Sequence, residues 1–299
     1  MAELVRSDDG AWSWKGASPE EVRSEHGQAM PRYMAALDPA FTQAQESCEF
    51  DFLHALIPVF GLLSAGWDPY QTTIRAVQGT LDMIDEATDF EKARHLQLWL
   101  WGHIVEASAP YELLARLLAV CAGERPLETH FPDSQRGVPQ SPWKKTMALQ
   151  EQADALGLGD VLVPFREVWD GKLRNAVFHA DYTLFGKSVR LPRVPAEYVH
   201  EEVERLIVRA LCFHWALEMM RTGSLAEYTE PKVISAGAFA PGEMATVIVR
   251  EGYGAVGLKD AYSPEELAAG AIPFRMGIFT DAERTMLEAD PRRAALPSR

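Results

Sequence analysis

The stretch from Leu173 to Tyr182 reads Leu-Arg-Asn-Ala-Val-Phe-His-Ala-Asp-Tyr, and the rest of the chain is best understood around it. A cation, a carboxamide and an imidazole lie there within two turns of an otherwise apolar segment, which we predict to be helical. At about 100° per residue, Asn175 and His179 share one face of a helix, about 40° apart. Arg174 lies roughly 140° around the helix from His179. The two groups therefore converge only if the helix frays at its end, if Arg174 uses its long reach, or if a second subunit supplies the missing half.

An arginine, a polar residue directly after it and a histidine beyond four intervening residues, in an apolar helical setting, resemble the motif of the HEPN superfamily. The resemblance is to its metal-independent ribonucleases of toxin and antiviral systems. The matching residues are Arg174, Asn175 and His179, and a looser resemblance to helical bundles that carry this motif late in the chain covers residues 40–225. It implies a metal-independent endoribonuclease in a toxin or antiviral-defence setting, with RNA as substrate and with no metal and no cofactor. An antitoxin or another protein partner would fit such a setting.

Cleaving RNA without a metal needs a base for the 2′-hydroxyl proton, an acid for the leaving oxygen and positive charge near the phosphorane. A histidine can serve either proton-transfer step near neutral pH, and an arginine can meet phosphate oxygens with two parallel donors. His179 would transfer protons, Arg174 would stabilise the phosphate, and Asn175 would orient the imidazole or contact a phosphate. One Arg–His pair lacks the second proton-transfer group. We therefore expect a homodimer with a shared cleft that cleaves RNA by transesterification and leaves a 2′,3′-cyclic phosphate.

Four further residues are candidates for substrate binding. Lys172 adds a cation beside the motif, and Asp181 and Tyr182 directly follow it, although Asp181 could simply end the helix. Glu106, on an earlier predicted helix, is expected to line the same cleft as His179.

A structural reading stays open beside the catalytic one. Arg174 could pair with an acid such as Glu167 or Asp170, and His179 could be satisfied between helices. The chain would then be a non-catalytic helical module that binds a nucleotide or a protein partner. Exposure of Arg174 and His179 in a groove would favour catalysis, and burial of both against acids would favour the module.

The formal net charge of −14 argues against broad electrostatic capture of nucleic acid, because phosphate contacts need local cations. Basic residues nevertheless outnumber acidic ones between Trp143 and Arg193, against the sign of the whole chain. They are Lys144, Lys145, Arg166, Lys172, Arg174, Lys187, Arg190 and Arg193. A phosphate would be tolerated best in this segment.

Composition and cysteine usage are those of a globular protein of the cytoplasm. Cys48, Cys121 and Cys212 are few and widely spaced, with no Cys-x-x-Cys pair and no secretory pattern. The most apolar stretch, residues 56–66, is too short to cross a bilayer, so we expect no membrane association. His103 with Glu106, and His214 with Glu218, reverse the Glu-x-x-His order of two-metal bundles, so we expect no metal site.

The sequence predicts a mainly α fold in three parts. Residues 1–40 are expected to be an irregular N-terminal arm, residues 41–230 a HEPN-like helical bundle, and residues 231–299 a small mixed α/β appendage. Periodicity and capping signals predict helices over residues 41–64, 69–83, 89–104, 111–122, 143–156, 163–179 and 196–221. A hairpin over residues 182–191 should follow the motif helix and turn at Gly186-Lys187. Two strands, residues 245–250 and 255–258, and a helix capped by Ser263 are expected in the appendage.

Overall fold

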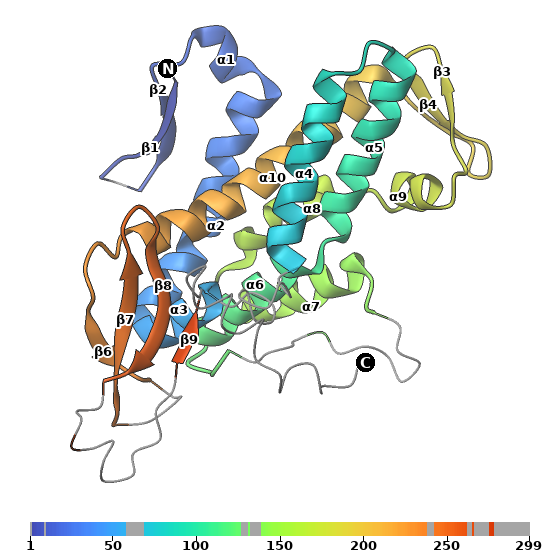
Figure 1. Cartoon of the computed structure of the whole chain (residues 1–299). Helices are drawn as coiled ribbons and strands as arrows, with labels where there is room; N and C mark the ends of the chain where they lie inside the picture. Colours follow the sequence, from blue (N-terminus) through green and yellow to red (C-terminus); the bar gives the residue numbers. More distant parts are fainter. Residues whose placement is uncertain are drawn as a thin grey trace, which may run out of the picture.

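Helices make up most of the computed structural model, which describes residues 2–8, 10–57, 69–126, 131, 139–237, 242–261, 265 and 275–277. Three small antiparallel sheets accompany them (Figure 1). The prediction of a mainly α protein is therefore confirmed. Among the described helices, none combines the length and the apolarity that a membrane span requires.

The N-terminal part is regular, so the prediction of an irregular arm over residues 1–40 is wrong. Strands β1 (Glu3–Arg6) and β2 (Trp12–Lys15) pair as a hairpin, and helices α1 (Pro19–Arg23) and α2 (Glu25–Ser47) follow. Two prolines lie inside α2, where each removes a helix hydrogen bond. The burial of a long apolar face outweighs that cost, because Tyr33, Leu37 and Phe41 are all buried.

Four helices follow: α3 (Glu49–Leu56), α4 (Pro69–Asp85), α5 (Phe90–Glu106) and α6 (Ser108–Cys121). The helix predicted over residues 41–64 is instead the end of α2 and all of α3, with a break at Cys48, and residues 58–64 lie outside the described part. The predicted N-cap of α5 is confirmed, since the Asp89 carboxylate accepts hydrogen bonds from the backbone N–H groups of Glu91 and Lys92 at 3.3 and 3.2 Å.

The middle of the chain carries the motif. Helix α7 (Pro142–Ala155) leads through a 3₁₀ turn (Gly159–Leu162) into α8 (Val163–Val168) and α9 (Gly171–Phe178). One continuous helix over residues 163–179 was predicted, and this is wrong. Trp169 adopts an extended conformation with ψ 122°, and the Asp170 side chain starts a new helix.

The hairpin predicted after the motif is confirmed as β3 (Thr183–Phe185) and β4 (Ser188–Leu191). A third strand, β5 (Ala196–Tyr198), pairs with β4, so α10 (His200–Ala226) begins later than predicted. Helix α10 also runs past its predicted end at residue 221, and Leu225 in its last turn is buried in the core.

A four-stranded antiparallel sheet closes the described part, with strand order β6 (Val233–Ser235), β7 (Met244–Arg250), β8 (Gly254–Asp260) and β9 (Arg275–Gly277). The two predicted strands are confirmed as β7 and β8, and the predicted Ser263 cap lies outside the described residues. The sheet packs against α3 and α10. Gly254 allows this approach: its φ is +79°, and a Cβ there would lie 2.0 Å from the backbone oxygen of Leu225.

The helical core forms where α10 packs against α2, α5 and α8 (Figure 1). Aromatic rings fill it: the Phe165 centroid lies 5.1 Å from that of Tyr111 and 4.6 Å from that of Phe213. Trp101 of α5 is fully buried, and its indole N–H donates a hydrogen bond to the backbone oxygen of Val168 at 3.0 Å. This bond ties α5 to the last residue of α8, directly before the link that positions α9.

Candidate functional site

Helix α9 is short and is held at both ends. At its start, the Asp170 carboxylate accepts hydrogen bonds from the backbone N–H groups of Lys172 and Leu173 at 3.0 and 2.9 Å. At its end, the His179 N–H donates to the Asn175 oxygen at 3.0 Å, and the Asp181 N–H donates to the Ala176 oxygen at 2.8 Å. Together these bonds fix eight residues as one unit.

The turn that ends α9 runs through Ala180, whose φ is +53°. Glycine normally occupies such a left-handed position after a helix, because it has no Cβ. Among the residues that the structure describes, Ala180 is the one non-glycine residue with a positive φ. The backbone directly after His179 is therefore strained, as it often is at functional sites.

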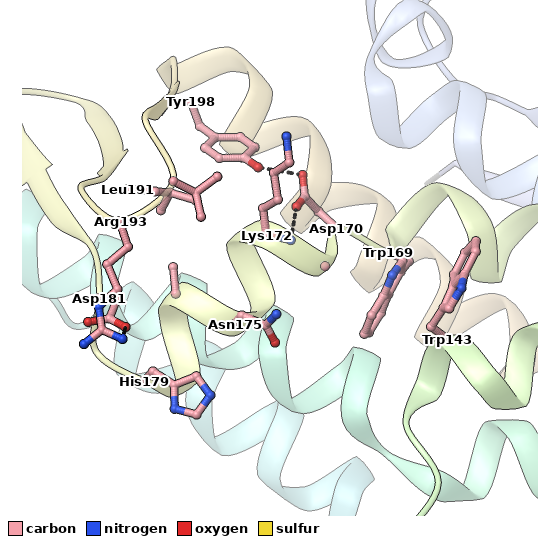
Figure 2. Close-up of a pocket in the computed structure, with 13 residues that line it drawn as sticks. Trp143, Trp169, Asp170, Lys172, Asn175, His179, Asp181, Leu191, Arg193 and Tyr198 are labelled. Atoms are coloured by element: carbon pink, nitrogen blue, oxygen red, sulfur yellow. Dashed lines mark hydrogen bonds and ion pairs between the residues drawn. The ribbon is translucent and has the colours of Figure 1, made fainter.

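An open pocket of about 890 Å³ lies along one face of α9 (Figure 2). That volume is within the range of small-molecule and cofactor sites. Its walls come from α7, α9, the α8–α9 link and the segment around β4 and β5. The lining residues are Trp143, Trp169, Asp170, Gly171, Lys172, Asn175, Ala176, His179, Asp181, Leu191, Arg193, Val194 and Tyr198.

Asn175 and His179 share the pocket face of α9, so this part of the prediction is confirmed. Both side chains are exposed. Lys172 and Ala176 lie on the same face, as the helical repeat requires. Figure 2 shows the two tryptophans at one end of the pocket and Arg193 with Asp181 at the other, with Asn175 and His179 between them.

Arg174 lies on a different face of α9 and does not line the pocket. Its Nε donates to Oε1 of Glu106 on α5 at 2.5 Å, and its Nη1 donates to Oδ1 of Asn175 at 3.0 Å. The guanidinium also lies over the Phe178 ring, 5.1 Å from its centroid. The side chains of Arg174 and Glu106 are each 27% exposed. Arg174 is therefore linked to the pocket through its hydrogen bond to Asn175.

The predicted acid partners of Arg174 are engaged elsewhere. Glu167 accepts a hydrogen bond from the Tyr33 hydroxyl at 2.9 Å and pairs with Arg32. Asp170 caps α9. The sequence favoured these acids because they are close along the chain, whereas Glu106 is 68 residues away. The expectation that Glu106 lines the same cleft as His179 is not met, since Glu106 contacts Arg174 and is not among the lining residues.

The two residues after the motif diverge. Asp181 lines the pocket and pairs with Arg193 at 3.1 Å. Tyr182 turns away to α5, where its hydroxyl lies 2.7 Å from Nδ1 of His95, and burial raises the pKa of this tyrosine. A role in substrate binding at the pocket is thus open to Asp181 and not to Tyr182.

Several residues that line the pocket were not predicted from the sequence. The Tyr198 hydroxyl donates to Oδ2 of Asp170 at 2.9 Å. Burial is the larger cause of a raised pKa of Tyr198, and this hydrogen bond is the second. Trp143, Trp169 and Arg193 were also missed as site residues. Asp170-Gly171 is a turn signal that could have revealed the helix break and its aromatic neighbour.

No group of three or more His, Cys, Asp or Glu side chains suited to a metal ion occurs within the described ranges. Comparison of the chain with family models, with curated proteins and with solved structures finds no significant match.

Proposed function

We propose that this protein is a metal-independent endoribonuclease, of the kind that the HEPN resemblance implies, with its reaction centre in the pocket along α9. One observation carries the proposal. An exposed imidazole, His179, lines an open pocket beside a carboxamide, Asn175, and two cationic side chains, Lys172 and Arg193. This set contains a proton-transfer group, a neutral hydrogen-bonding group and two cations for phosphate, of which Arg193 is paired with Asp181 in the structure.

The reaction follows from these groups. A base removes the proton of the ribose 2′-hydroxyl, and the 2′-oxygen attacks the adjacent phosphorus. The new bond joins phosphorus to the 2′-oxygen, the bond to the 5′-oxygen breaks, and an acid protonates that leaving oxygen. The products are a 2′,3′-cyclic phosphate and a 5′-hydroxyl. His179 serves one proton transfer, and Lys172 and Arg193 stabilise the phosphorane.

A second copy of the chain supplies the second proton-transfer group. Exposed aromatic surface supports a homodimer through the face shared by α5 and α9. The side chain of Phe178 is 50% exposed and its ring packs against Gly102 of α5. Trp99 lies one turn before Gly102 and is 58% exposed. Such rings are common anchors of protein interfaces. Arg174 lies on this face too, with its guanidinium over the Phe178 ring.

Three free cysteines among the described residues support a reducing, cytoplasmic setting. A toxin or antiviral role, with an antitoxin or another protein as partner, rests on the resemblance alone.

Incubating unstructured RNA with the purified protein in EDTA tests the function. We expect cleavage with 2′,3′-cyclic phosphate ends, and a specific rate that rises with protein concentration as the dimer forms, with mass followed by sedimentation. Products with 5′-phosphate ends, or cleavage that EDTA abolishes, would overturn the proposal. A strict monomer with full activity would remove the dimer from it.

Replacing Glu106 by glutamine is expected to tighten RNA binding up to about fivefold. The change removes the charge that holds Arg174, and partly exposed ion pairs contribute about 0.2–1 kcal/mol. The freed guanidinium can then meet a phosphate. The measurement is the dissociation constant of a 2′-O-methyl oligonucleotide, which cannot be cleaved. Glu197→Gln is the matched control, because Glu197 pairs with Arg190 outside the pocket.

The closed Arg174–Glu106 pair also favours a second candidate, a non-catalytic module that binds a nucleotide or a protein partner. If Glu106→Gln leaves binding unchanged or weakens it, Arg174 serves to hold Asn175 rather than to bind phosphate. Tight nucleotide binding without any cleavage would then establish the module.

A further inference from the structure

Two tryptophans come from different elements to the same end of the pocket. Trp143 is the second residue of α7, and Trp169 lies in the link between α8 and α9. Both line the pocket, and Figure 2 shows their ring systems near each other with a similar tilt. Trp143 is 45% exposed, although an indole normally contributes to folding by burying a large area.

Packing explains only part of this arrangement. Trp169 is half-buried against the core, and a Cβ at Gly171 would lie 3.5 Å from its Nε1, so the chain passes close to the ring. Both rings therefore leave surface facing the pocket.

We propose that Trp143 and Trp169 form a nucleobase-binding subsite. This rests on the proposed function, in which the pocket takes RNA. Indole faces stack on any base, because every base has a π-face, and each stacked base contributes substantially to affinity. The neighbouring Lys172 and Asn175 supply a cation and an amide on the phosphate side of such a base.

The subsite holds a base a few nucleotides away from the scissile linkage. Gly171, which lies beside the Trp169 ring, is the first residue of α9, and His179 directly follows the last one. The two residues are eight positions apart, which is about 12 Å along the helix axis. At about 3.4 Å per stacked nucleotide, this spans about three or four nucleotides, and fewer in an extended strand. A base can enter only when it is unpaired and unstacked from its neighbours. Loss of the subsite should therefore raise KM much more than it lowers kcat.

The test measures binding of a labelled, unstructured 2′-O-methyl oligonucleotide by fluorescence anisotropy, alongside cleavage of the matching RNA. Trp143→Ala should raise the dissociation constant about 5-fold to 100-fold. Trp143→Phe keeps a flat ring and should retain most of the affinity. Tyr253→Ala is the control, since Tyr253 is an exposed aromatic residue outside this pocket. An abasic oligonucleotide should bind the wild-type protein as weakly as the normal one binds Trp143→Ala.

The experiment can overturn the proposed subsite and the proposed nuclease activity separately. Weakened binding in Trp143→Ala, with no cleavage by any variant, keeps the subsite and removes the nuclease. Unchanged binding and KM in Trp143→Ala, with cleavage intact, removes the subsite and keeps the nuclease. Equal binding of single-stranded and duplex oligonucleotides, or no binding to the wild-type protein, also overturns the subsite. Trp143 decides the matter, because Trp169→Ala would also disturb the core.

Discussion

Replacing His179 by alanine is expected to lower the rate of RNA cleavage in EDTA by about 10²-fold to 10⁴-fold, the usual contribution of a general acid or base. The imidazole is exposed in the pocket and follows directly on α9, so its removal leaves the helix and its caps in place. Binding of a 2′-O-methyl oligonucleotide should therefore stay nearly unchanged. The measurement is single-turnover cleavage across pH, where the wild-type rate should depend on pH and the residual rate of the variant should lose one limb of that dependence.

His26→Ala provides the matched control for this experiment. His26 is near the start of α2, between the rings of Trp14 and Trp215 and outside the pocket. This variant should cleave RNA at the wild-type rate. If His179→Ala and His26→Ala are equally active, the reaction does not use the imidazole of His179, and the pocket remains only a binding site.

The second large effect concerns stability. Replacing Trp101 by alanine is expected to lower the free energy of unfolding by about 3–5 kcal/mol, the usual cost of removing a large aromatic side chain from a core. Trp101 is fully buried, and its loss leaves both a cavity and a backbone oxygen, that of Val168, without its indole donor. Urea denaturation followed by circular dichroism measures the change.

Two comparisons separate the causes of this loss. Trp101→Phe keeps much of the side-chain volume but not the indole donor. It should therefore lower the free energy of unfolding less than Trp101→Ala does, but more than a substitution on the surface does. Trp215→Ala removes an indole that is partly exposed on α10 and should cost far less. A cost for Trp101→Ala no larger than that for Trp215→Ala would contradict its role as the anchor between α5 and α8.

Local signals in the sequence predicted those features that depend on neighbours along the chain. The shared face of Asn175 and His179 follows from the helical repeat, the Asp89 cap from side-chain chemistry, and the hairpin after the motif from its glycine turn. These features need no knowledge of tertiary packing.

Features that depend on distant contacts were missed. Helix α2 forms despite Pro31 and Pro39, because burial of its apolar face against α10 outweighs the lost hydrogen bonds. The partner of Arg174 belongs to another helix, and no pattern within the motif indicates Glu106. The convergence of Trp143 and Trp169 likewise requires the break at Trp169 and the placement of the first turn of α7 at the same pocket.

The left-handed turn at Ala180 has a consequence for how long the imidazole stays in place. A residue with a Cβ in this conformation costs about 1–2 kcal/mol, so the last turn of α9 is under tension. The backbone hydrogen bonds from Asp181 N–H to the Ala176 oxygen and from Ala180 N–H to the Val177 oxygen hold it there. Any partner that pulled on the hairpin would release that tension, let the helix end unwind, and carry the imidazole out of alignment without touching it.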